Sequence, residues 1–179
     1  MEFTEAQRNR IAAGKKWLAE IREESADQLI ARLHDYQESL NATLAHLTDA
    51  QWTFSPAPNK WSIRDVCHHI THSVRSIAIL TKALAAGKDG PGDLAMGLKD
   101  EDTGASADEL GAQLRKAFQR AEESMRLFDR EVDMTKTVEH PIFGELNSKE
   151  WAVFNLMHLS IHIRQIEGIK KESAYPGST

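Results

Sequence analysis

Two histidines near the carboxyl end of the chain, His158 and His162, have a spacing suited to metal binding. In an α-helix, residues four positions apart lie one above the other on the same face. Two imidazoles placed in this way can direct their nitrogens at one divalent ion. The other interpretation is a structural pair that is hydrogen-bonded to the backbone or to buried water, or that faces a solvent cleft. The spacing alone leaves both open.

The residues around this pair indicate that it points toward the protein core. The amides of Asn155 and Gln165 fall in the same sector of the predicted helix. Two core-facing imidazoles and an amide need partners, because burying an unpaired polar group is costly. A metal ion is one way to supply them. The apolar residues that share or border this face are Trp151, Phe154, Ile161, Ile166 and Ile169.

A third imidazole is available from the segment 62–86, which contains His68, His69 and His72. At about 100° of rotation per residue, His69 lies roughly 80° from the centre of the apolar stripe of this segment. His72 lies about 140° from that centre and His68 almost opposite it. We therefore predict His69 as the third ligand and His68 as a solvated surface residue. His72 is expected to be exposed and is only a reserve ligand.

The other reactive residue types are expected to be structural. Cys67 lies about 160° from His69, so we expect a buried, inert thiol rather than a nucleophile. His34 and His46 have no companion at ligand spacing and are expected at the surface or in packing contacts. His140 precedes a proline in a predicted loop, where it could reach the mouth of a site but is expected to face solvent.

Four tryptophans, Trp17, Trp52, Trp61 and Trp151, are expected to be core residues. Trp61 and Trp151 also stand near the starts of the two histidine-bearing segments. They are therefore candidates to line a pocket beside the three histidines.

The elements that must position these residues are helices. Apolar residues at three- and four-residue steps predict helices over about 4–24, 26–47, 62–86, 106–131 and 148–168, and no segment has a convincing strand pattern. Residues 55–59 contain two prolines and must form a loop. We predict an N-terminal helical extension over 1–25, a four-helix bundle over 26–170 and a tail over 171–179. Helix starts are marked by capping-box pairs at Thr4 and Gln7, Ser62 and Asp65, Ser106 and Glu109, and Asn147 and Glu150.

Composition limits the classes of partner. The chain has 179 residues, with 22 Lys and Arg against 27 Asp and Glu and a net charge of −5. This balance argues against nucleic acid as a partner, because phosphate binding needs clustered cations. No apolar run approaches the roughly 20 residues that span a bilayer. With one cysteine and no basic, apolar leader at the N-terminus, a cytoplasmic location is expected.

Two stretches resemble motifs of the DinB-like superfamily. Residues 60–70, Lys-Trp-Ser-Ile-Arg-Asp-Val-Cys-His-His-Ile, resemble the motif that opens its second core helix, with a histidine eight residues after the tryptophan. Residues 158–166, His-Leu-Ser-Ile-His-Ile-Arg-Gln-Ile, resemble its closing motif. Residues 140–144, followed by Glu150 and Trp151, are similar to the lead-in of one subgroup. The resemblance covers about 45–170, and the order and separation of the two main motifs agree.

The resemblance implies an all-α, DinB-like four-helix bundle in which His69, His158 and His162 bind a divalent metal facially. Zinc or nickel is expected first, then iron or manganese, because imidazole ligands suit several metals. The family implies a homodimer and a small-molecule substrate.

Two classes of function stay open. One is a metal-dependent enzyme, either a thiol-dependent S-transferase with a low-molecular-weight thiol as cosubstrate or a small-substrate hydrolase, in which Asn155 and Gln165 orient ligands or substrate. The other is a non-catalytic metal protein of stress response or dimer assembly. No carboxylate is clearly placed as a general base, because Asp65 is better explained as a helix cap.

Overall fold

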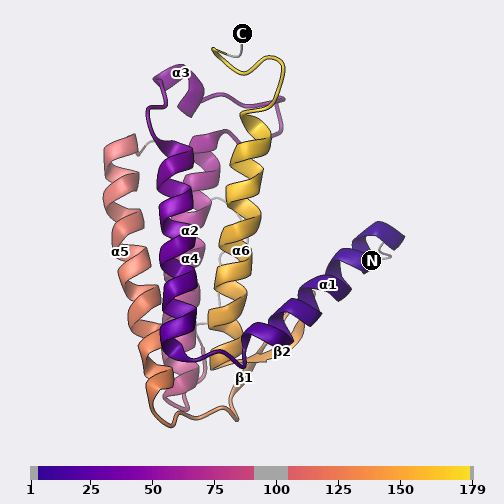
Figure 1. Ribbon diagram of the computed structural model, residues 1–179, viewed down its shortest axis with the longest axis vertical. Coiled ribbons are helices and arrows are strands. Elements are labelled where there is room, and N and C mark those ends of the chain that lie inside the picture. Colours follow the sequence, from indigo (N-terminus) through magenta and orange to yellow (C-terminus); the bar gives the residue numbers. More distant parts are fainter. Residues whose placement is uncertain (1–3, 91–104, 178–179) are drawn as a thin grey trace.

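A computed structural model describes residues 4–90 and 105–177 of the chain. Four long helices, α2 (Ala26–Leu44), α4 (Ile63–Ala85), α5 (Ala107–Met125) and α6 (Ser148–Ile169), lie side by side as a bundle (Figure 1). The predicted all-α fold is therefore confirmed, with one two-stranded sheet as a small addition.

The predicted helix starts are confirmed, because each has a complete capping box. At Thr4, Ser62, Ser106 and Asn147, the side-chain oxygen accepts a hydrogen bond from the backbone N–H three residues on, and that residue's side chain accepts from the cap N–H. The carboxyl-terminal ends of two helices differ from their predicted positions. Helix α2 ends at Leu44, because Ala45 is extended and His46 has a φ of 60°. Helix α5 ends at Met125 and is followed by the 3-10 helix η2 (Arg126–Asp129).

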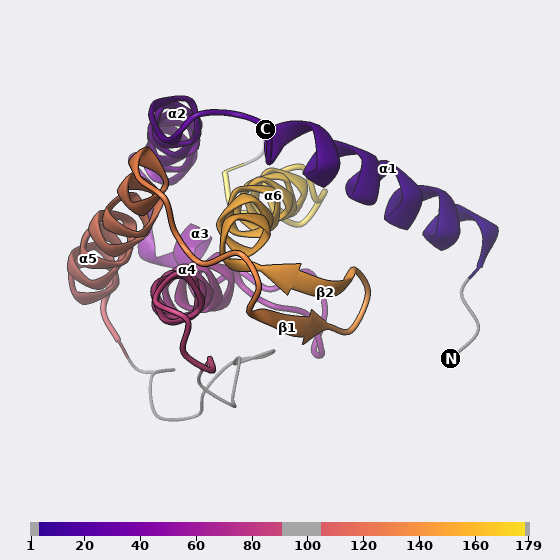
Figure 2. The same ribbon diagram turned by 90° about the horizontal axis from the view of Figure 1, so that it is seen from below.

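The order of the helices is not a simple up-and-down arrangement. Helix α4 packs against α5 and α6, and α2 packs against the same two helices from the other side (Figure 2). Lys82, late in α4, forms an ion pair of 2.6 Å with Glu123, late in α5. The two helices therefore run in the same direction. Most of the predicted loop between Gly87 and Ser106 lies outside the described residues.

Helix α1 (Glu5–Ile21) lies outside the four-helix bundle and leads away from it (Figure 1). Its last turns bury Leu18 and Ile21 in the common core, and Arg22 donates a hydrogen bond of 2.7 Å to Glu150 at the start of α6. A one-turn helix, α3 (Asp49–Trp52), follows α2 at the far end of the bundle. It was not predicted from sequence.

A short antiparallel hairpin leads into α6, and the expectation of no strands is wrong here. Strand β1 (Thr137–His140) pairs with β2 (Gly144–Asn147), and His140 lies opposite Gly144. Four residues per strand are too few to produce a recognisable alternation. Gly144, with a φ of 81°, starts the second strand in a backbone conformation that glycine readily adopts.

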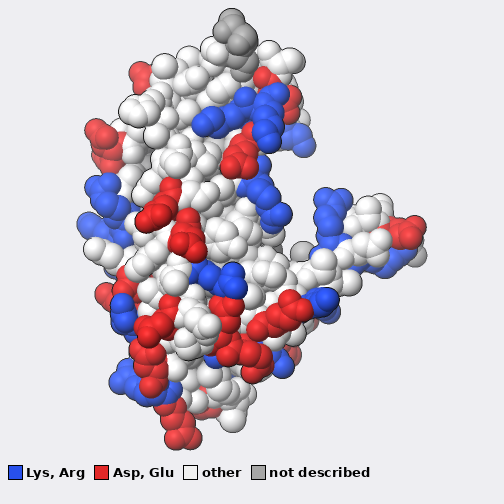
Figure 3. Space-filling model, in the orientation of Figure 1, with Lys and Arg blue, Asp and Glu red and all other residues white. Residues whose placement is uncertain are grey.

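Helix length and surface charge are two further features of the described residues. None of the helices in the described ranges is long and apolar enough to cross a membrane. On the face seen in Figure 3, basic and acidic side chains are interspersed.

Candidate metal centre

Three histidines predicted as ligands come together between α4 and α6. Nε2 of His158 lies 3.2 Å from Nε2 of His69 and 3.1 Å from Nε2 of His162. The candidate ligand atoms of the three residues all lie within 4.8 Å of one another. Helix α4 supplies one imidazole and α6 supplies two, so the packing of these two helices assembles the cluster.

The spacing of the nitrogens fits a metal ion. A metal–imidazole bond is about 2.1 Å long, so two ligands about 90–110° apart at the metal are about 2.9–3.4 Å from each other. The observed separations of 3.1 and 3.2 Å fall within this range. The donor set is also suitable, because neutral imidazoles bind divalent transition metals.

Burial favours the neutral form of the two imidazoles on α6, His158 and His162. It lowers the pKa of His158 to about 3, and the neighbouring His162 and His69 lower it further. Burial also lowers the pKa of His162, although the hydrogen bond to Gln165 opposes this shift. A neutral imidazole has a free lone pair on one nitrogen, and metal binding requires that lone pair.

Gln165 fixes the orientation of one member of the cluster. Its Oε1 lies 2.8 Å from Nδ1 of His162, so Nδ1–H donates and Nε2 keeps its lone pair. A hydrogen bond to the second ring nitrogen is a usual companion of a metal-binding histidine. Gln165, predicted to support the site, therefore bonds directly to a member of the cluster.

Asn155 and Trp151 lie deeper in the bundle and act on its packing. Asn155 is 3% exposed and its Nδ2 donates to the backbone oxygen of Val74, which ties α6 to α4 below the histidines. Trp151 is fully buried, and its Nε1 donates to the backbone oxygen of Val138, which fixes the hairpin on α6.

Trp61 lies against the cluster. Its ring centroid is 4.9 Å from that of His69 and 6.2 Å from that of His162, and the second pair is stacked. Trp61 and His158 are both partly exposed, whereas His69 is buried. The cluster is therefore covered by an aromatic ring on one side but is not sealed from solvent.

His140 is buried, and the expectation that it faces solvent is wrong. It ends strand β1, and its ring packs against Phe154 at a centroid distance of 4.4 Å and against Trp151 at 5.5 Å. Its Nδ1 accepts hydrogen bonds from the backbone N–H groups of Ile142 and Phe143, so Nε2 carries the hydrogen. Burial lowers its pKa to about 4. The burial of His140 was not predicted, because the hairpin that carries this residue was not predicted.

Of the remaining predictions for α4, the one for Cys67 is confirmed and the one for His68 is wrong. His68 is 2% exposed, so its assignment to the surface is wrong, and His72, which lies beside it, is only partly exposed. Helix α4 is packed on two sides, by α5 and α6, and one apolar stripe cannot describe such a helix. Cys67 is buried as predicted, and burial raises the pKa of its thiol to about 12.

The prediction for His34 is confirmed and the prediction for Ile161 is wrong. His34 is exposed as expected and lies 3.1 Å from Glu122 of α5. Ile161, which was expected to border the core face of α6, is 46% exposed.

Comparison with known proteins gives a family and a fold. The chain matches the family model of the DinB superfamily over residues 32–166, whereas no curated protein matches it. It is similar in structure to TT2238, a four-helix bundle protein, with a TM-score of 0.60 and 23% identity over 80% of this chain and 99% of that chain. It is also similar to YfiT from Bacillus subtilis, described as a probable metal-dependent hydrolase with an unusual four-helix bundle topology. That similarity has a TM-score of 0.63 and 18% identity, over 95% of this chain and 89% of that one. Because the family model spans most of the bundle, the chain belongs to the DinB superfamily.

Proposed function

We propose that this protein is a metal-dependent enzyme in which His69, His158 and His162 hold one divalent ion, zinc or nickel in the first instance. The observation that carries the proposal is the convergence of three imidazole nitrogens at metal-ligand spacing in a site that is partly open to solvent. A divalent ion held by three neutral ligands supplies a Lewis acid with open positions, at which water or a thiol becomes a nucleophile near neutral pH.

The chain's own residues would prepare and shield such a site. The lowered pKa values of His158 and His162 keep both imidazoles available as ligands at neutral pH. Gln165 would hold His162 in the ligating tautomer, and Trp61 would exclude bulk water from one side and offer an aromatic surface to a substrate. These features suit a small electrophilic substrate that reaches the ion past Trp61.

Two reactions share this chemistry, and they differ in the nucleophile. With water the enzyme is a hydrolase, an activity that the description of YfiT as a probable metal-dependent hydrolase supports. With a low-molecular-weight thiol it is an S-transferase, as the resemblance to the DinB-like superfamily implies. In both cases, the protein contributes ligand geometry, orientation of the imidazoles and partial exclusion of water.

The test is an activity screen on protein of defined metal content. Wild-type protein is stripped with a chelator, reloaded with zinc or nickel, and offered activated esters or a generic electrophile with several low-molecular-weight thiols. We expect turnover that requires metal and is lost in the His158→Ala/His162→Ala variant. The matched control is His34→Ala, which removes an exposed histidine and should retain the wild-type rate.

The outcomes separate the alternatives. Stoichiometric metal with no turnover on any substrate would favour a non-catalytic metal protein. Equal metal content in the wild type and the double variant would show that these histidines are not the ligands. Turnover that survives removal of metal would overturn the proposed chemistry.

A further inference from the structure

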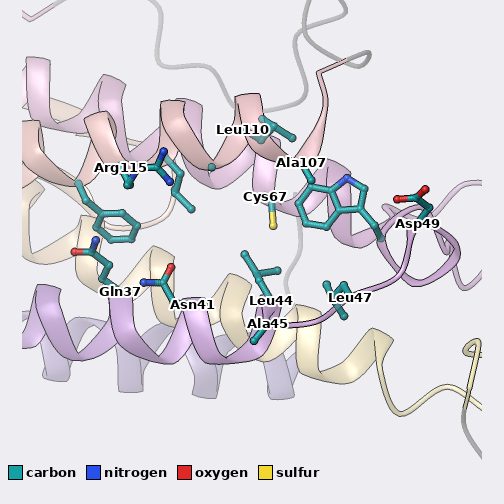
Figure 4. Close-up of a pocket in the computed structure, with 14 residues that line it drawn as sticks. Gln37, Asn41, Leu44, Ala45, Leu47, Asp49, Cys67, Ala107, Leu110 and Arg115 are labelled. Carbon is teal, nitrogen blue, oxygen red and sulfur yellow. The ribbon is translucent and has the colours of Figure 1, made fainter.

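A cavity lies on the side of α4 that is turned away from the three histidines. It is about 350 Å³ in volume and is bounded by α2 and α5, with Trp52 of α3 at one end. The thiol of Cys67 points into it from α4 (Figure 4). None of the three clustered histidines is among its lining residues, so it is a separate feature.

The cavity is elongated and its walls are mainly apolar. Leucines from both helices, Leu44 of α2 and Leu110 and Leu114 of α5, form its sides. Along α5 its lining runs from Ala107 to Phe118, and these eleven steps correspond to roughly 16 Å of helix. The volume lies within the range of about 300–1,000 Å³ that is typical of small-molecule sites.

The two ends of the cavity differ in charge. The guanidinium of Arg115 lies at one end, opposite the amides of Gln37 and Asn41 on α2, whereas the carboxylate of Asp49 lies at the other end (Figure 4). Among the described residues, the Arg115 guanidinium forms no ion pair or hydrogen bond. By contrast, Arg126, the first residue of η2, is paired with Glu122 of α5.

This arrangement is complementary to an amphipathic anion. An apolar chain would lie between the leucines. Its head group would lie at the end that carries Arg115, where two amides can donate further hydrogen bonds. Guanidinium groups bind carboxylates through strong, charge-assisted hydrogen bonds. The carboxylate of Asp49 disfavours the reverse orientation, because it would repel an anionic head group.

We propose that this cavity binds a straight-chain monocarboxylate, with the apolar chain along α5 and the carboxylate on Arg115. The length of the cavity suits a saturated chain of about ten carbons. Nothing in this binding needs the three histidines, so the proposal stands apart from the metal-dependent activity proposed above.

The first test measures the role of the charge. Decanoate, decanol and decylamine are titrated calorimetrically, each below its micellar concentration, into wild-type protein and into two variants. We expect the wild type to bind decanoate about tenfold more tightly than decanol and to bind decylamine most weakly. Arg115→Gln should lower decanoate affinity to the level of decanol, whereas Arg120→Gln, an exposed arginine of the same helix outside the cavity, should change nothing.

The second test measures the location. A β-carbon added at Gly111 would lie 3.6 Å from Nη1 of Arg115. Gly111→Leu therefore fills the head-group end and should weaken both decanoate and decanol more than tenfold, while its helix propensity is better than that of glycine. Gly168 of α6 has open space around it, so Gly168→Leu is the matched control and should bind normally. The His158→Ala/His162→Ala variant should also bind decanoate normally.

Each contrary outcome overturns the proposal. Absence of decanoate binding to the wild type, or tighter binding of decylamine, would show that the cavity does not take this ligand. Equal losses in Arg115→Gln and Arg120→Gln would show that general surface charge is responsible. Loss of decanoate binding in the double histidine variant, with Gly111→Leu unaffected, would place the carboxylate at the metal instead.

Discussion

The two sides of helix α4 carry an imidazole and a thiol only two residues apart, and these two groups have opposite properties. His69 faces α6, where two more imidazoles meet it and all can offer lone pairs to one ion. Cys67 faces α2 and α5, where leucines surround the thiol and burial raises its pKa to about 12. The contrast shows that the neighbouring helices, rather than the residue type alone, decide what a reactive side chain can do.

The largest expected effect concerns metal affinity on the histidine side. The His158→Ala/His162→Ala variant leaves a single imidazole, and a divalent ion should bind at least about ten thousandfold more weakly. Competition with a chromophoric chelator measures the affinity. Cys67→Ala changes the other side of α4 and should leave the metal affinity within about twofold, which is a change of under half a kcal/mol. Similar losses in the two variants would remove the distinction between the sides.

The second effect concerns the thiol. Because burial raises the pKa of Cys67 from 9.0 to about 12, the reactive thiolate is about a thousandfold rarer near pH 8. We expect alkylation by iodoacetamide to be about a thousandfold slower in the native protein than in the urea-unfolded chain, as followed by mass spectrometry. Chelation of metal should not change the native rate. A native rate within tenfold of the unfolded rate would show that this side is open and reactive.

The convergence of the three histidines could be predicted from the sequence because the relevant geometry is local. The four-residue spacing of His158 and His162 places both on one face, and helical rotation selected His69 over two neighbouring histidines. All three then came together in the structure, and Gln165, in the same sector, bonds to His162.

The failures have a common physical cause, which is packing by elements distant in the sequence. His68 is buried because α4 has neighbours on both sides, and His140 is buried because a hairpin too short to predict folds it onto α6. The cavity beside Cys67 was also not predicted, since its walls come from α2 and α5 and depend on how those helices pack. The capping boxes, in contrast, are local and were predicted correctly.

A smaller effect is expected from the residue that orients one ligand. Replacing Gln165 with alanine removes the acceptor for the Nδ1–H of His162, and such supporting contacts typically change metal affinity by about 10–100-fold. Gln119→Ala, an exposed glutamine on α5, is the matched control and should retain wild-type affinity. If both variants bind metal equally well, Gln165 has no role in holding the ligand.

The smallest expected effect is a change in how the free energy of unfolding depends on pH, and it concerns His140 rather than Cys67. Burial lowers the pKa of His140 to about 4, whereas the unfolded residue titrates near its ordinary value of 6.5. Above pH 6.5 both states are neutral, so the shift has no effect on stability. Between pH 6.5 and about 4 the unfolded chain binds a proton that the folded chain does not, so the free energy of unfolding falls as the pH falls.

For His140 alone this loss is roughly 2 kcal/mol at pH 5. We therefore expect His140→Gln to be less stable than the wild type at pH 7, because the Nδ1 that accepts from Ile142 and Phe143 is lost, yet to lose less stability on acidification. Urea unfolding of chelated protein between pH 7.5 and 5 measures both quantities.

Cys67→Ala is the comparison from the other side of α4, and its stability should fall with pH in parallel with the wild type, since the thiol is protonated throughout this range. Parallel curves for all three proteins would mean that His140 takes up its proton in the folded state, and that this part of the core is more open to water than its packing against Phe154 and Trp151 indicates.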